Sequence, residues 1–182
     1  NVEFHGGFSQ YNAQGEVARN ALIARGWTIT DGGLAEEFYF NIEVDTTNSG
    51  VSNNDQFQFT GAVGNYDVEA YQGGSEVATF LGLVNEERIT LPSAGIYELR
   101  IIPKPNFDKF TFSNGGDKDK LLNVLQWGLY GVNEPNQREA FWGCNLAQIP
   151  DGGAWFDVVT DGSAMFLSNN LTSLPEGMEL PN

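Results

Sequence analysis

The side chains that could take part in catalysis or bind a metal ion include one histidine, one cysteine and 24 carboxylates. A serine or cysteine hydrolase would need His5 as its general base, and Cys144 is the one thiol. His5 ends a short strand-like stretch before Gly6-Gly7, and Cys144 occupies a small-residue position typical of a buried core. One His and one Cys do not make an ordinary zinc site. The sequence therefore predicts a protein that is not an enzyme.

A loop rich in oxygen ligands is the one candidate metal site. Asp45 and Asp55 enclose Asn48, Asn53 and Asn54, and Ca²⁺ prefers oxygen ligands of this kind. No Asp-x-Asp-x-Asp-Gly loop is present, so ordinary Asx turns between two strands are the competing interpretation. We otherwise expect no cofactor. The tryptophans are either core residues or platforms on which sugar rings stack; they are Trp27, Trp127, Trp142 and Trp155.

The charge balance excludes some classes of partner. The 182 residues carry 24 Asp and Glu against 9 Lys and Arg, a net charge of −15. Nucleic acids and anionic membranes are bound by clustered cations, so neither is an expected partner. No apolar stretch is long enough to cross a membrane. We expect an acidic, solvated surface suited to an extracellular or cell-surface location.

Residues 36–112 show a period of two that is typical of antiparallel strands. Their spacing predicts an immunoglobulin-like β-sandwich. Tyr97, two residues after Gly95, is either a tyrosine corner or an ordinary strand residue. The expected strands are 38–44, 57–59, 66–71, 77–80, 88–91, 96–102 and 107–112.

Residues 113–182 contain an internal repeat of 25 residues. Phe141 and Phe166 are 25 residues apart, and so are Leu146 and Leu171. A further step back from Leu146 gives Leu121. This period is that of leucine-rich repeats, whose units stack because none can bury its apolar face alone. The segment predicts a partial solenoid.

Residues 1–35 form a separate small segment. Residues 2–5 and 27–30 are strand-like, and between them lies a helix that begins near Asn12 and ends at Gly26. Such a segment is too small to bury its own apolar face. We therefore expect it to cover the bare end of the C-terminal repeats, within one chain or between chains.

The two ends of the chain resemble the BspA-like leucine-rich-repeat surface proteins, whose unit is also described from mycoplasma lipoproteins. Val159-Thr160-Asp161, Met165-Phe166 and Leu171-Thr172-Ser173-Leu174-Pro175 match the family unit, and residues 26–33 match the element that closes such arrays. The middle is similar to polycystic-kidney-disease-type domains, although Tyr71-Gln72-Gly73-Gly74 replaces their Trp-Gly-Asp-Gly turn.

The resemblance implies a non-catalytic binding or adhesion module that recognises a protein or a glycan. Its ligand would bind the exposed strand face of the repeats, where the candidate residues are Asn123, Gln148, Thr172 and Ser173. A solvated polar face without a ligand is the alternative interpretation of the same residues. The alternative functions are a structural spacer in a long adhesin or fibre and a carbohydrate-binding module. Self-association through the incomplete repeat ends is also expected.

Overall fold

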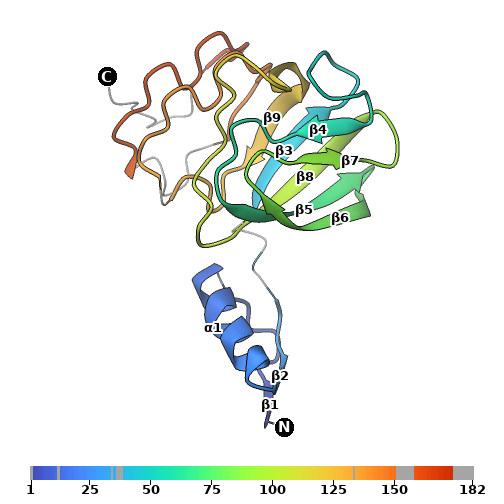
Figure 1. Cartoon of the computed structure of the whole chain (residues 1–182), viewed down its shortest axis with the longest axis vertical. Coiled ribbons are helices and arrows are strands. Elements are labelled where there is room, and N and C mark those ends of the chain that lie inside the picture. Colours follow the sequence, from blue (N-terminus) through green and yellow to red (C-terminus); the bar gives the residue numbers. More distant parts are fainter. Residues whose placement is uncertain are drawn as a thin grey trace.

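The structure is a computed structural model, and it describes residues 2–11, 13–33, 35, 39–132, 134–150 and 158–173. An N-terminal unit of one helix and two strands projects from a larger body of β-sheets and stacked loops (Figure 1). The protein is mainly β, with antiparallel sheets in the body and one α-helix among the described residues. No helix of that part of the chain is long and apolar enough to span a membrane.

A five-stranded antiparallel sheet forms the centre of the body, in the order β6-β5-β8-β3-β9. Alternate residues along the three middle strands β5, β8 and β3 are buried, so one face of the sheet covers the core and the other faces outward. The five strands are β3 (Phe40–Asp45), β5 (Asn65–Gln72), β6 (Ser75–Val84), β8 (Ile96–Pro103) and β9 (Leu121–Gln126).

A short second sheet lies over the core face. It pairs β4 (Gln56–Gln58) with β7 (Arg88–Thr90) and contributes the buried side chains of Phe57 and Ile89. The hydroxyl of Tyr97 donates a hydrogen bond of 2.8 Å to the carbonyl of Ser93, four residues back along the chain. Tyr97 therefore closes its own turn, as a tyrosine corner does.

The stretch 107–112 is not a strand, which corrects the expectation from its aromatic residues. Phe107, Phe110 and Phe112 are all buried, but their spacing follows no period of two. The backbone there binds two different neighbours, because the amide of Asp108 donates to Val63 and the amide of Phe112 donates to Ala140. The three buried phenylalanines therefore lie on irregular backbone and not on a strand.

Leu121 and Val124, expected to start the repeats, lie in β9 at the edge of the central sheet. β9 pairs antiparallel with β3, and both side chains are buried in the shared core. On its other side the carbonyl of Leu122 accepts a hydrogen bond from the amide of Ala147. β9 therefore belongs to the sheet and also adjoins the segment that contains Ala147.

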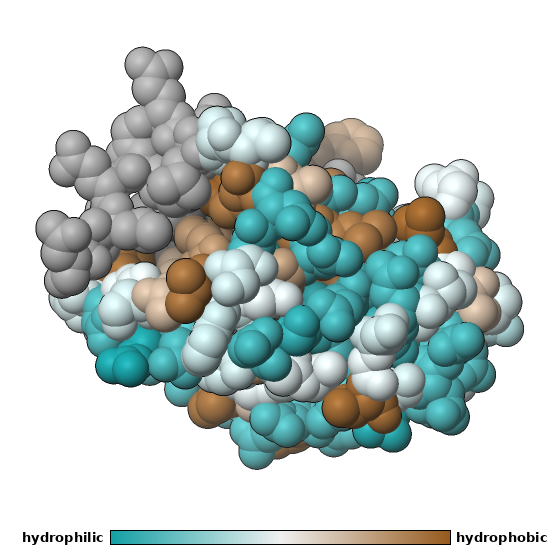
Figure 2. Space-filling model, turned by 90° about the horizontal axis from the view of Figure 1, so that it is seen from above, coloured by the Kyte–Doolittle hydropathy of each residue, from teal (hydrophilic) through white to brown (hydrophobic). Residues whose placement is uncertain are grey.

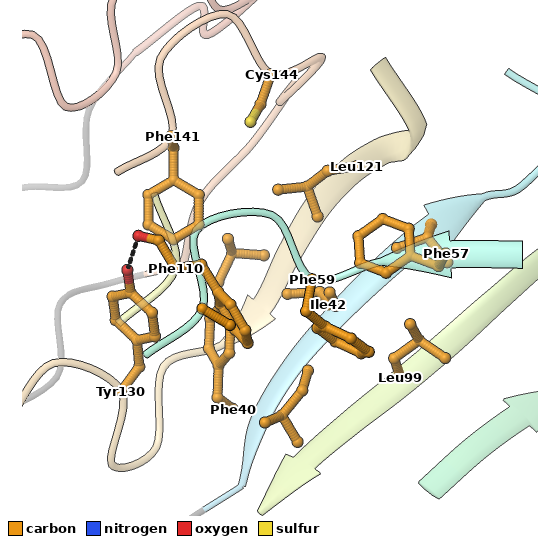
Figure 3. Close-up of a cluster of buried hydrophobic side chains, with 14 of the residues drawn as sticks. Phe40, Ile42, Phe57, Phe59, Leu99, Phe110, Leu121, Tyr130, Phe141 and Cys144 are labelled. Carbon is orange, nitrogen blue, oxygen red and sulfur yellow. Dashed lines mark hydrogen bonds between the residues drawn. The ribbon is translucent and has the colours of Figure 1, made fainter. Parts of the chain in front are cut away.

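Aromatic side chains fill the core where the sheet meets the C-terminal segment (Figure 3). The rings of Phe40 and Tyr130 lie 4.5 Å apart between centroids, and Phe141 lies 5.4 Å from Tyr130. The Tyr130 hydroxyl donates to the carbonyl of Phe110, and complete burial raises its pKa. Side chains from the predicted sandwich and from residues 113–182 thus share one core. The predicted boundary at 112 stays a prediction.

Among the described residues of the C-terminal segment, the loops 135–150 and 158–173 lie side by side. Each amide in a series from the first loop donates to a carbonyl 24 residues later, in the pairs Gln137–Asp161, Glu139–Ser163, Phe141–Met165 and Gly143–Leu167. Phe141 and Phe166 stack with ring centroids 5.8 Å apart. Leu174 and Pro175 of the predicted second unit lie outside the described residues.

The N-terminal unit contains β1 (Val2–His5), α1 (Ala13–Ala24) and β2 (Trp27–Thr30), as the sequence predicts. β1 and β2 are parallel, and α1 connects them. Gly26 has φ of +88°, a backbone conformation that favours glycine after a helix end. Lys104, just after β8, pairs with Glu16 of α1 and with Asp67 of β5, which joins the unit to the body.

Candidate functional site

The outward face of the five-stranded sheet carries one continuous row of polar side chains. Across neighbouring strands, Tyr71 pairs with Glu98, Glu98 with Glu43, and Glu43 with Asn123. The sequence neighbours Ala70, Leu99 and Val44 are buried in the core. Because successive side chains of a strand point to opposite faces, the row points away from the core. The amide nitrogen of Asn123 donates 2.6 Å to Oε2 of Glu43. The predicted site residue Asn123 is therefore part of this face.

A second row runs beside the first and places a cation over an aromatic ring. It contains Glu69, Arg100, Asn41 and Gln126. The guanidinium carbon of Arg100 lies 4.1 Å from the centre of the Tyr71 ring, and Arg100 Nε donates 2.8 Å to Glu98 Oε1. The Tyr71 hydroxyl donates to Glu69, and burial together with this carboxylate raises the pKa of Tyr71. We call the two rows together the sheet face.

One acceptor on the sheet face is unsatisfied. Oδ1 of Asn41 is buried and, within the described part of the chain, has no hydrogen-bond partner. An unpaired buried polar atom costs about 1–3 kcal/mol, so such atoms are uncommon in folded proteins. Asn41 lies in register with Arg100 and Gln126.

The sheet face continues onto the loop 135–150 beside β9. A hollow of about 240 Å³ is lined by residues of both segments, among them Asn123 of β9 and Gln148 of this loop. Gln148 is exposed. The structure thus brings together two of the predicted site residues. Thr172 and Ser173 are exposed as well but do not line this hollow.

Sequence reasoning missed the part of the face on β3, β5 and β8, namely Glu43, Tyr71, Glu98 and Arg100. Glu43, Glu98 and Arg100 alternate with buried residues on predicted strands, which is a usable signal of an outward-facing side chain. The strand order that aligns them in one row is not visible in the sequence.

The suspected calcium loop is organised around the side chain of Lys120. The Lys120 ammonium donates to the backbone carbonyls of Ser52, Asn53 and Gln56 at 2.8–3.1 Å. Burial lowers its pKa, and the carboxylate of Asp117 opposes that shift. Asp45 binds the amide and hydroxyl of Thr47 as in an Asx turn. Among the described residues, no group of three or more His, Cys, Asp or Glu side chains is placed to hold a metal ion.

The remaining candidates lie apart from the sheet face. Cys144 is 1% exposed, and burial raises the pKa of its thiol, which makes the nucleophilic thiolate scarce. His5 is exposed at the end of β1. Trp127 is buried in the core, Trp142 is half-buried, and Trp155 lies outside the described residues.

Comparison with family models, with curated proteins and with solved structures found no match for this chain.

Proposed function

We propose that the protein is a non-catalytic binding module of the cell surface or extracellular space, and that its ligand occupies the sheet face. The observation that carries the proposal is the row from Tyr71 through Glu98 and Glu43 to Asn123, which leads to the hollow beside Gln148. An ordered, outward row of polar groups around one aromatic ring suits recognition of a surface ligand.

A glycan fits the chemistry of this face best. The carboxylates and amides around the Tyr71–Arg100 pair can accept hydrogen bonds from hydroxyl groups and donate hydrogen bonds to them. A protein ligand is the second candidate, since Gln148, Thr172 and Ser173 extend the exposed polar surface onto the repeat units.

We further propose an immunoglobulin-like sandwich joined to partial leucine-rich repeats of the BspA-like kind. The backbone hydrogen bonds between residues 24 apart support stacked repeat units. In addition, the side-chain nitrogen Nδ2 of Asn170 donates a hydrogen bond of 2.8 Å to Oδ1 of its counterpart Asn145. The two packed sheets and the Tyr97 bond support the sandwich. A spacer in a long adhesin or fibre is the alternative function that this stacking favours.

A glycan array and a panel of surface proteins, both probed with the full chain, test the binding function. We expect a ligand whose binding falls at least tenfold in Tyr71→Ala and in Gln148→Glu. Phe8→Ala is the matched control, because Phe8 is fully exposed in the N-terminal unit and should retain binding. If a ligand binds both variants with full affinity, its binding site lies outside the sheet face. The absence of any ligand would leave the spacer as the better proposal.

A further inference from the structure

The two edges of the five-stranded sheet differ in what lies beside them. At one edge, β9 adjoins the segment of Ala147, whose amide donates to the carbonyl of Leu122. At the other edge, β6 pairs with β5 on one side, and no strand of the described part of the chain pairs with its other side. This edge lies on the side of the body away from the C-terminal loops (Figure 1). An edge strand directs amides and carbonyls outward, where another strand can pair with them.

Three large apolar side chains of β6 are exposed to solvent. Val77 is 39% exposed, Leu81 74% and Val84 42%. Glu76 is the one charged residue of this strand, which contains no Lys and no Pro. Lys and Pro are residues that protect an edge strand against pairing. Seen from above, the described surface is largely hydrophilic, with scattered hydrophobic residues (Figure 2). The exposed edge of β6 therefore combines unpaired backbone with apolar side chains.

The pairing of β6 with β5 limits the kind of strand that the edge accepts. Two register shifts interrupt the ladder, one at Val77 and the other at Leu81 and Gly82, while residues 78–80 pair regularly between them. Such bulges bend a strand and re-aim its side chains. A bent edge does not match a long flat strand. It therefore favours a short partner segment over unlimited edge-to-edge stacking.

Carboxylates lie at both ends of this edge. Glu76 is the second residue of β6, and Glu86 and Glu87 follow its last residue closely. All three are exposed, and none of them forms an ion pair within the described residues. The whole range 65–87 contains no Lys and no Arg. A complementary partner therefore has cations on both sides of an apolar centre.

A second copy of the chain does not supply that complement. Antiparallel pairing of two β6 strands would bring Glu76 of one molecule toward Glu86 and Glu87 of the other. Parallel pairing would bring the two copies of Glu76 together. Like charges placed opposite each other across an interface oppose association.

We propose that β6 is a docking edge for a short extended segment of a basic protein, which adds to the sheet as a further strand. Backbone hydrogen bonds to the edge supply affinity, as in other cases of strand addition. The apolar centre of the segment covers Val77 and Leu81, and its Lys or Arg side chains face the carboxylates at either end. This edge is separate from the hollow beside Gln148, so the proposal does not depend on a ligand of the sheet face.

A designed peptide tests the proposal against the full chain by fluorescence anisotropy. The probe alternates valine with threonine and carries two lysines at each end. We expect saturable binding that weakens as salt is added. The same peptide with glutamates in place of the lysines should bind at least tenfold more weakly. A lysine peptide that is N-methylated at alternate residues should also lose at least tenfold, because it lacks the amides that pair with the edge.

Variants of the full chain locate the binding site. Leu81→Lys and Glu76→Lys should each weaken binding of the lysine peptide at least tenfold. Leu167→Lys and Glu3→Lys are the matched controls and should retain it, because Leu167 is 53% exposed on loop 158–173 and Glu3 is exposed on β1. Circular dichroism verifies that each variant is folded, and Val84→Lys replaces Leu81→Lys if the latter is not.

Several results would overturn the proposal. They are the absence of binding by the lysine peptide, equal binding of the glutamate or N-methylated peptide, and an equal loss in the control variants. A wild type that dimerises, together with a monomeric Leu81→Lys, would also overturn it, because the edge would then belong to a second copy. Gln148→Glu tests the sheet face and should bind the peptide normally, so the two proposals fail separately.

Discussion

The ammonium nitrogen of Lys120 lies 3.9 Å from Oδ2 of Asp117, and neither side chain is accessible to solvent. Asp117 accepts hydrogen bonds from the amides of Val51, Ser52 and Gln58, while Lys120 binds carbonyls of the same loop. The pair therefore fixes the loop between β3 and β4 against the start of β9. A buried charge of this kind is tolerated only while its partners remain.

Replacing Lys120 with methionine should destabilise the protein by about 3–5 kcal/mol, because it leaves the Asp117 carboxylate and three carbonyls buried without their cation. Urea unfolding measures this change in the free energy of unfolding. Arg138→Met is the control, since Arg138 forms an exposed pair with Glu139 and should cost less than about 1 kcal/mol. Equal losses in the two variants would contradict a structural role for the buried pair.

Truncating the stacked phenylalanines should have unequal effects. Phe141 is fully buried, so Phe141→Ala should lower the free energy of unfolding by about 3–5 kcal/mol. Phe166 is only partly buried, and its replacement by alanine should cost clearly less. Thermal or urea unfolding of both variants provides the comparison. If Phe166→Ala costs as much as Phe141→Ala, the outer loop contributes more to the core than its exposure indicates.

The N-terminal unit should loosen in acid. The Arg19 hydrogen bond of 2.7 Å lowers the pKa of Asp31; burial opposes this, and the amide of Gly33 adds to it. A lowered folded-state pKa means that the stabilisation is complete above the ordinary Asp value of about 3.9 and is lost as pH falls through the folded value.

Nuclear magnetic resonance of the Thr30 and Gly33 amides, followed from pH 5 downward, monitors this transition. Asp31→Asn should abolish the pH dependence of these signals. Persistence of the transition in that variant would assign it to another group.

The Cys144 thiol should resist alkylation in the folded protein. Burial both raises its pKa and blocks access, so iodoacetamide should label it slowly in native conditions and rapidly in urea. Ser75→Cys, at an exposed hairpin position, supplies a thiol that should react quickly in the same folded protein. Mass spectrometry separates the two sites. Rapid native labelling of Cys144 would show that the core around Phe141 opens readily.

Local patterns were sufficient to predict many elements. The alternation of Phe40, Ile42 and Val44 with polar residues predicted β3, because a strand exposes every second side chain to water. The 25-residue spacing pairs Phe141 with Phe166, and the rings of these two residues stack in the structure. The strand prediction failed at 107–112, where backbone hydrogen bonds to Val63 and Ala140 replace a strand ladder.

The sequence by itself determined most of the helix and strand positions and the 25-residue spacing of Phe141 and Phe166, since these follow from patterns along the chain. Only the tertiary structure decided that β9 pairs with β3, that Lys120 fills the suspected calcium loop, and that Tyr71, Glu43 and Asn123 form one face. The physical reason is that these relationships join residues tens of positions apart. Their free energy comes from strand register and from burial in the shared core, and neither is encoded in the local pattern of any one segment.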